Sequence, residues 1–182
     1  MTQQWLIHFH IGPVQSFIAA GRRTQDLLVG SWLLSELAKA GVEAAQRAHA
    51  DLLYPSIVEG ALAASVPNLF AFLTTEQPRD VAVFVEDAIR ERWKSFTAAV
   101  KGWLARQVGG GDWEAVFDRQ VSNWMELYWV AVKYDPRNHA GSFDQVKRAM
   151  AARKNARHLP QVEEPGRKCT LTGAASALPL KW

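Results

Sequence analysis

The first residues that could do chemistry lie at a corner where a predicted strand runs directly into a predicted helix. Gly12, Pro13, Gln15 and Ser16 follow the alternating apolar residues of 5–11. Gly12 permits a sharp turn, and Pro13 suits the first position of a helix, where its missing N–H costs nothing. The first N–H groups of a helix lack partners within it and attract anions such as phosphate, and the Ser16 hydroxyl can join them. The corner therefore predicts a phosphate site, although a purely structural turn explains the same residues.

Metal-dependent phosphoryl transfer needs two carboxylates near strand ends, and the sequence shows no such pair. The first strand ends in His10-Ile-Gly12 without an acid. The string Gly109-Gly-Gly-Asp112 carries one acid and follows a predicted helix, so we interpret it as a linker. We therefore predict no catalytic residue in this chain.

Two histidines and one cysteine are the remaining candidates for chemistry. His8 and His10 share one face of the first strand, since side chains alternate along a strand. Two histidines at this spacing can chelate a metal, but a third ligand is needed and none stands out nearby. We therefore expect a sheet face turned toward water or a partner. Cys169 is the only cysteine, so no intrachain disulfide is expected.

Hydrophobic periodicity predicts the elements that position these residues. It indicates strands over 5–11, 51–56, 68–75 and 125–134, and helices over 13–28, 31–50, 78–108, 113–121 and 143–156. Gly30-Ser31 is predicted to break the first helix in two, with Ser31 capping the second piece. The order of the main elements, βαββαβ, is that of an α+β, ferredoxin-like fold. In that fold both helices cover one face of a four-stranded antiparallel sheet.

Length and charge suggest one domain with an appendage. The chain has 182 residues, of which 48% are hydrophobic, enough for a sizeable core. Residues 141–182 carry eight Lys/Arg against three Asp/Glu, whereas residues 1–140 carry thirteen against fifteen. We assign 1–140 to the ferredoxin-like domain and 141–182 to a basic helix followed by an irregular segment. The basic end is a candidate nucleic-acid surface, and a solvated helix face is an equally ordinary interpretation.

The sequence shows no signal for export or membrane insertion. The N-terminal residues lack the basic and apolar regions of a signal peptide, and no apolar run approaches the length of a membrane span. We therefore expect a cytoplasmic protein without membrane contact.

Several runs carry a family resemblance. They are Ile11-Gly-Pro-Val-Gln-Ser-Phe-Ile18, Arg22-Arg-Thr-Gln-Asp-Leu27, Gly30-Ser-Trp-Leu-Leu-Ser35 and Gly166-Arg-Lys-Cys-Thr-Leu-Thr-Gly173. Together they resemble the large subunit of the type III-B CRISPR RNA-silencing (Cmr) effector complex, which is similar to polymerases and nucleotide cyclases with a palm domain. The resemblance covers nearly all of residues 5–173 and is to the first of two palm domains. It implies a ferredoxin-like palm that lacks the Gly-Gly-Asp-Asp motif and metals of the second.

The resemblance implies a role for the corner and a set of partners. Gly12, Pro13, Gln15 and Ser16 would line a nucleotide pocket shared with the second palm. The family makes cyclic oligoadenylates from ATP with Mg²⁺ or Mn²⁺, whereas this chain alone is expected to be inactive. Implied partners are other subunits of the antiviral complex, guide RNA, target RNA and the second palm, with self-association through an uncovered palm surface. The cationic residues that would contact RNA or a partner are Arg22, Arg23, Arg153, Lys154 and Arg157.

The run at 166–173 resembles the start of the family's zinc-binding insertion, which contains two Cys-x-x-Cys pairs. Cys169 matches the first cysteine, but Thr172 stands where the second would be. One thiolate cannot hold structural zinc, so zinc is doubtful and Cys169 is a candidate ligand only if the chain continues.

Two alternatives belong to other functional classes. A stand-alone RNA-binding module would stack bases on exposed sheet aromatics, for which Phe70, Tyr128 and Trp129 are the candidates. A structural interaction domain would use its tryptophans in a protein interface.

Overall fold

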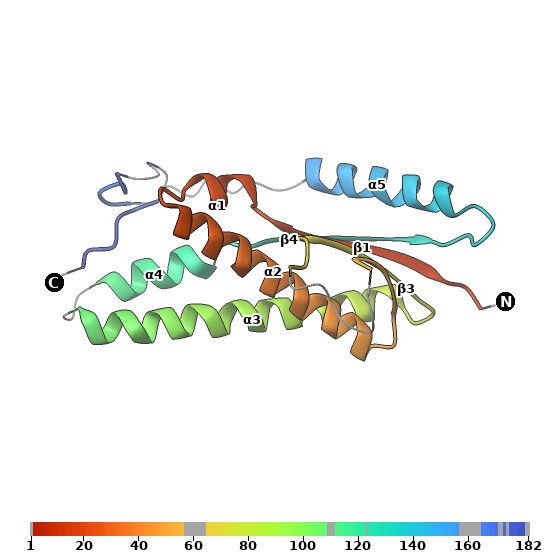
Figure 1. The fold of residues 1–182 in the computed structure, drawn as a ribbon, viewed down its shortest axis with the longest axis horizontal. Helices are drawn as coiled ribbons and strands as arrows, with labels where there is room; N and C mark the ends of the chain where they lie inside the picture. Colours follow the sequence, from red (N-terminus) through yellow and green to blue (C-terminus); the bar gives the residue numbers. More distant parts are fainter. Residues whose placement is uncertain are drawn as a thin grey trace.

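The computed structural model describes residues 2–56, 65–108, 112–122, 124–156, 165–170, 173 and 175–180, and the structural statements below concern these residues. The elements are β1 (Trp5–Gly12), α1 (Gln15–Ala19), α2 (Thr24–Arg47), β2 (Asp51–Tyr54), β3 (Leu69–Thr74), α3 (Pro78–Gln107), α4 (Trp113–Ser122), β4 (Glu126–Lys133) and α5 (His139–Asn155). The strands form one antiparallel sheet in the order β2-β3-β1-β4. Helices α2 and α3 lie on one face of this sheet and α5 lies on the other (Figure 1). The predicted α+β class and the four predicted strands are confirmed.

β1 is the central strand of the core, because it pairs with β3 on one side and β4 on the other. Its residues Ile7, Phe9 and Ile11 face α2 and α3. The Phe9 ring stacks on Phe70 of β3 with centroids 5.1 Å apart and planes 2° apart, and on Trp129 of β4 with centroids 6.5 Å apart. Aromatic pairs across neighbouring strands thus fix the register of the three strands.

The long helix α2 approaches the sheet closely at a glycine. A Cβ atom on Gly41 would lie 2.7 Å from Cζ of Phe70 and 2.9 Å from Cδ1 of Ile89. Both of those side chains are fully buried, so neither can move aside without disturbing the core. Gly41 therefore allows α2, α3 and β3 to meet.

The predicted break at Gly30-Ser31 is wrong, since α2 runs through it. Gly30 is buried, and a Cβ there would lie 3.3 Å from the Phe17 ring of α1, so the glycine makes room for that ring. The chain breaks earlier, between α1 and α2, where Asp26 Oδ2 accepts hydrogen bonds from the backbone N–H groups of Arg22 (3.1 Å) and Arg23 (3.0 Å). A carboxylate at this position in the first turn starts a new helix.

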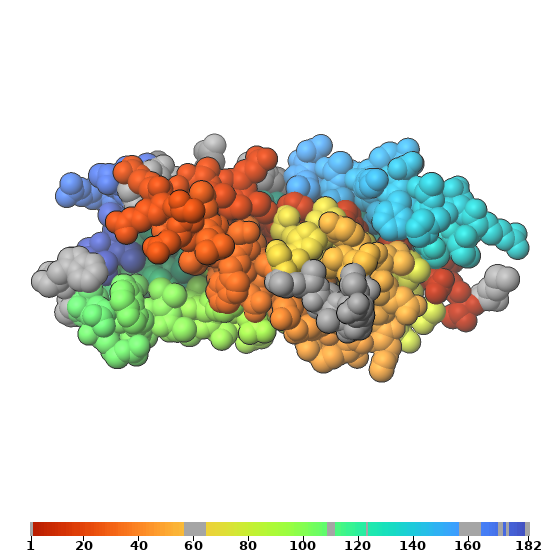
Figure 2. All heavy atoms as spheres, in the orientation of Figure 1, coloured from red at the N-terminus to blue at the C-terminus, as the bar shows by residue number. Residues whose placement is uncertain are grey.

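The prediction that helices cover only one face of the sheet is also wrong. Val146 and Met150 of α5 are buried, and Val146 packs on the sheet with Leu6 and Val132. α5 begins at His139, four residues before the predicted start, with Asn138 Oδ1 accepting a hydrogen bond from Gly141 N at 3.0 Å. Figure 2 shows the atoms of α5 as a separate block at the upper right of the molecule.

A smaller apolar cluster joins the C-terminal end of α3 to α4 and to residues near Leu180. Leu104 and Val108 pack with Trp113 and Phe117 of α4, and Leu180 near the C-terminus packs against them. Trp113 is only 2% exposed, so at least one of the eight tryptophans is a core anchor. None of the helices in the described ranges has the length and apolar character needed to cross a membrane.

Candidate functional site

A hollow of about 530 Å³ opens at the end of β1, where the strand turns toward α1. It is lined by His10, Gly12, Pro13, Val14, Gln15, Ser16, Asn68, Glu126 and Lys154. These residues come from four separate parts of the chain, which are residues 10–16, Asn68, Glu126 of β4 and Lys154 of α5. The structure thus brings all four predicted nucleotide-binding residues together with one of the predicted cationic residues, Lys154.

The corner itself is built differently from the prediction. Gly12 pairs with Glu126 of β4, and α1 begins only at Gln15 and has five residues. Such a short helix carries little macrodipole, so side chains rather than a long helix N-terminus must supply any affinity for an anion. Gln15 and Ser16 are exposed on the lining, where a donor amide and a hydroxyl can reach a ligand.

His10 lies at the base of the hollow between two hydrogen-bond donors. Lys154 Nζ is 3.2 Å and Asn68 Nδ2 is 3.4 Å from His10 Nε2. Asn68 also donates to the Ile11 carbonyl at 3.0 Å, which ties the strand end to the start of β3. Burial, followed by the nearby Lys154 charge, lowers the pKa of His10, although Glu126 opposes the shift. The ring is therefore neutral at pH 7 and accepts at Nε2, so the neutral form carries its hydrogen on Nδ1.

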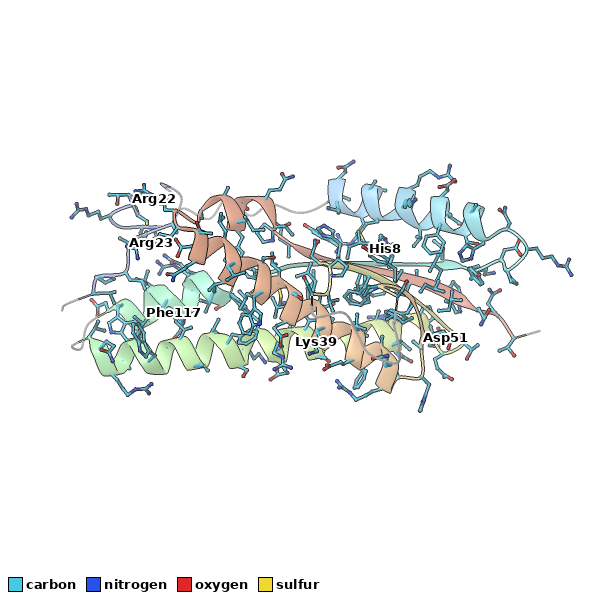
Figure 3. The ribbon with its side chains drawn as sticks, in the orientation of Figure 1. His8, Arg22, Arg23, Lys39, Asp51 and Phe117 are labelled. Carbon is cyan, nitrogen blue, oxygen red and sulfur yellow. The ribbon has the colours of Figure 1, made fainter. Side chains whose placement is uncertain are left out.

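His8 lies behind this site, between the sheet and α5 (Figure 3). It is 7% exposed, so the predicted sheet face turned toward water or a partner is instead covered by the same chain. Burial, together with His10, Lys147 and Lys154, lowers the pKa of His8 to about 4. The Nδ1 atoms of both histidines are buried, and neither has a hydrogen-bond partner in the part of the chain that the structure describes. Proton uptake here therefore opposes the docking of α5.

Glu126 supplies the acidic side of the hollow. Tyr128 Oη donates to Glu126 Oε2 at 3.1 Å, and the Arg153 guanidinium lies over the Tyr128 ring at 5.6 Å. Glu126 is the single carboxylate on the described lining of this hollow. With this one carboxylate, the described lining does not fit a centre that holds two metal ions.

The other predicted cationic residues are not brought to this hollow. Arg22 and Arg23 lie at the far end of the molecule from His8 (Figure 3). Arg22 Nη2 donates to the Thr170 carbonyl at 3.4 Å, so it contacts the C-terminal segment. Arg153 lies on α5 at the edge of β4, and Arg157 is outside the described residues.

The described residues around Cys169 are held by backbone hydrogen bonds. Cys169 is half-buried, its N–H donates to the Ala175 carbonyl, and its carbonyl accepts from Gly173 N, both at 2.8 Å. Thr172 lies outside the described residues. Within the described ranges, no three His, Cys, Asp or Glu side chains gather as metal ligands would. The prediction about zinc stays a prediction.

The predicted stacking of bases on sheet aromatics is wrong. Phe70 is fully buried beneath α2 and α3, and Tyr128 is 7% exposed beneath α5. Trp129 is half-buried on the same core face as Phe70. Neither face of the sheet is an open aromatic platform.

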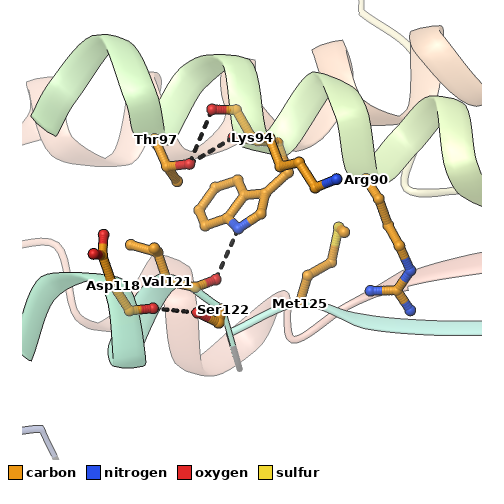
Figure 4. Close-up of a pocket in the computed structure, with 8 residues that line it drawn as sticks. Arg90, Lys94, Thr97, Asp118, Val121, Ser122 and Met125 are labelled. Atoms are coloured by element: carbon orange, nitrogen blue, oxygen red, sulfur yellow. Dashed lines mark hydrogen bonds between the residues drawn. The ribbon is translucent and has the colours of Figure 1, made fainter. Parts of the chain in front are cut away.

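A second hollow, of about 350 Å³, lies between α3, α4 and the start of β4 (Figure 4). Trp93 Nε1 donates to the Val121 carbonyl at 2.8 Å, and the Trp93 ring stacks on Trp124 with centroids 4.4 Å apart. Thr97 Oγ1 donates to carbonyls of its own helix. The Trp93 bond joins α3 to α4 and the Thr97 bonds stay within α3, so we assign the second hollow to packing.

Residues 6–98 match the family model described as CRISPR-associated protein Cmr2, N-terminal. The chain belongs to this family. The Cmr2 family places the chain in CRISPR-based antiviral defence and implies membership of the multi-subunit Cmr complex. A comparison with curated proteins found no match.

The Cmr2 match runs from β1 into α3, so it includes the corner and Asn68 but ends before Glu126 and Lys154. Sequence reasoning missed Asn68 and Glu126 as parts of the site. Asn68 follows a turn signal, Ser65-Val-Pro, and Glu126 is the acid that begins β4. Strand pairing was needed to find them, because it places Glu126 opposite Gly12 and Asn68 beside Ile11.

Proposed function

We propose that this chain forms one wall of a nucleotide pocket in the Cmr complex, as the first palm domain of a Cmr2 subunit. The proposed ferredoxin-like palm is supported by the chain order βαββαβ and by the strand order β2-β3-β1-β4 in an antiparallel sheet. The family match, which spans β1, α1, α2, β2, β3 and much of α3, supports the Cmr2 part of the proposal.

The observation that carries the proposal is the hollow at the β1 corner. Lys154 provides a compact cation for phosphate, and Ser16 and Gln15 provide neutral donors beside it. The carboxylate of Glu126 repels a phosphate but can accept hydrogen bonds from ribose hydroxyls or an amino group. The ligand would therefore lie with its phosphates toward Lys154 and α1, and with its sugar or base toward Glu126.

Catalysis is not assigned to this chain. The lining has one carboxylate, and its neutral His10 already accepts from Lys154 and lies near Asn68. ATP, when bound, would supply the phosphates, while residues of this chain hold and orient them. We propose that the reacting metal ions are held by a second palm, with guide and target RNA bound elsewhere in the complex.

Titration of the 182-residue chain with ATP tests the pocket. Lys154→Ala is expected to weaken binding roughly tenfold, because it removes a charge-assisted hydrogen bond to phosphate. Arg148→Ala is the matched control, since Arg148 is exposed on the same helix and lies outside the hollow. Arg148→Ala should change the affinity for ATP less than about twofold, because salt screens the interaction of an exposed charge outside the hollow with the ligand.

Amide chemical shifts measured in the same titration locate the ligand. The proposal predicts shifts at Gly12, Gln15 and Ser16. Equal losses of ATP affinity in Lys154→Ala and Arg148→Ala would contradict the proposal. Amide shifts confined to residues away from the hollow would contradict it too.

A further inference from the structure

β4 is an edge strand of the sheet, and within the described residues it lacks the shortness, bulge, proline and central charge that usually protect such an edge. It has eight residues, pairs with β1 without a register shift, and contains no proline. Its charged residues, Glu126 and Lys133, stand only at the two ends. The other edge strand, β2, has four residues and a register shift between Leu52 and Tyr54. Natural sheets protect their edges by shortness, bulges, proline or charge, so β4 is the exception here.

Two hydrogen bonds fix which backbone groups of β4 point outward. Ile11 N donates to the Asn68 carbonyl, so the odd-numbered residues of β1 direct their backbone groups toward β3. The even-numbered residues of β1 therefore bond to β4, in agreement with the bond from Tyr134 N to the Gln4 carbonyl. The backbone groups of Leu127, Trp129 and Ala131 must then point away from β1, to the open side.

The open side of β4 lies in a groove with an arginine on each wall. A hollow of about 360 Å³ is lined by Glu86, Arg90, Leu127, Trp129 and Arg153. Arg90 belongs to α3, which lies on one face of the sheet, and Arg153 belongs to α5, which lies on the other face (Figure 1). Glu86 binds Arg90 through Nε and Nη2, at 2.9 and 2.6 Å, which leaves Nη1 for a further partner.

We propose that the edge of β4 binds an extended, acidic segment of a partner protein, which adds to the sheet as a fifth strand. Outward N–H and C=O groups provide the pairing. Side chains alternate across a strand, so neighbouring residues of the added segment would face the α3 wall and the α5 wall in turn. Two consecutive acidic residues opposite Trp129 would therefore meet Arg90 and Arg153, one each.

The same charges disfavour a second copy of this chain as the occupant. Residues that point outward must pair with each other, so a two-fold antiparallel pairing can be centred on Trp129. That arrangement would place Arg153 near its counterpart, whereas the charge of Arg90 is already balanced by Glu86. Like charges at such close range destabilise the pair.

A synthetic eight-residue peptide of alternating threonine and valine, with two glutamates at its centre, tests the proposal on the 182-residue chain. We expect it to slow amide exchange at Leu127, Trp129 and Ala131. Ala131→Pro removes one outward N–H without touching a bond to β1, and should weaken binding roughly fivefold or more. Ala131→Thr keeps the N–H and should bind as the parent chain does.

A peptide with two lysines in place of the glutamates tests the charge of the partner. The parent chain should prefer the glutamate peptide, and Arg153→Glu should reverse that preference. The peptide preference of Arg153→Glu still tests the proposal if Ala131→Pro fails to fold. Equal binding of both peptides, unchanged binding by Ala131→Pro, or no amide protection at millimolar peptide would overturn the proposal. A dimer of the chain that Ala131→Pro abolishes would overturn it too, since the occupant would then be a second copy.

Discussion

At the residue scale, the most consequential feature is a pair of histidines held neutral beneath α5. His8 and His10 share the sheet face that α5 covers, and Lys147 and Lys154 of that helix lie near them. Two largely buried rings that can take up a proton therefore lie close to two lysine charges. Protonation of either ring would be unfavourable there, which links the docking of α5 to pH.

Stability is expected to fall as the pH drops from about 6.5 to about 4. The unfolded chain takes up a proton on His8 near pH 6.5, whereas the folded chain does so only near pH 4. Between these values the unfolded state binds more protons, so the free energy of unfolding decreases as the pH falls, by roughly 2 kcal/mol after allowance for partial solvation. Urea unfolding at a series of pH values measures this slope.

His8→Leu should reduce that slope, because leucine does not titrate and its neighbours on the sheet, Ala71 and Val130, are apolar. His139→Gln is the control, since His139 is exposed at the start of α5. An identical slope in His8→Leu and the parent chain would show that the acid sensitivity lies in other groups.

At the scale of elements, glycines decide how closely helices approach their neighbours. The lack of a side chain at Gly30 leaves room for the Phe17 ring against α2, and the lack of one at Gly41 leaves room for Phe70 and Ile89. Both glycines lie inside a 24-residue helix, where glycine costs about 1 kcal/mol relative to alanine. Packing must offset that cost, so the glycines mark the places where α2 touches α1, α3 and the sheet.

Gly41→Ala is expected to destabilise the fold by about 1–2 kcal/mol despite its better helix propensity, because the new methyl group overlaps Phe70 and Ile89. Gly102→Ala on α3 is the matched control. A Cβ at position 102 would meet only Arg106 Nη1, at 3.8 Å, so no clash is expected. The higher helix propensity of alanine should therefore stabilise the chain by about 0.5–1 kcal/mol. Thermal or urea unfolding compares the two, and changes of the same sign would contradict this account of α2.

At the scale of the whole molecule, the helical side carries a large apolar surface toward solvent. Leu28 is 70% exposed, and Trp32 of α2 and Trp103 of α3 are 51% and 52% exposed. The Trp32 ring contacts Phe96 with centroids 5.5 Å apart, and Val100 follows Phe96 by one turn, so the exposed residues of the two helices are neighbours. A patch of this kind is typical of an interaction surface.

We expect the isolated chain to self-associate through this patch as its concentration rises. Trp32→Glu should weaken the association by roughly tenfold or more, since it places a charge in the apolar contact. Gln145→Glu makes the same charge change on the exposed side of α5 and should leave the association unchanged. Sedimentation measures both variants. A strictly monomeric parent chain, or equal effects of the two changes, would rule the patch out as the contact, and Ala131→Pro should have no effect on it.

The sequence by itself determined the element types and their order. Alternation in β1 and the long apolar stripe of α3 are local periodicities, and they need no knowledge of what packs against them. The residues of the corner, Gly12 to Ser16, were also found from sequence, because glycine, proline and serine have positional preferences that act over a few bonds. The family resemblance was carried largely by the same local runs, and the match over residues 6–98 confirmed its coarser part, membership of the Cmr2 family.

Only the tertiary structure decided which residues complete the site. Lys154 and Glu126 reach the corner because α5 folds back over the sheet and β4 pairs with β1, and neither event has a signal in local periodicity. The predicted helix break at Gly30-Ser31 and the predicted exposure of Tyr128 were wrong for the same reason. A glycine can end a helix or allow close packing within it, and an aromatic residue in a strand can be exposed or buried. Which of these occurs depends on a neighbour that is distant in sequence.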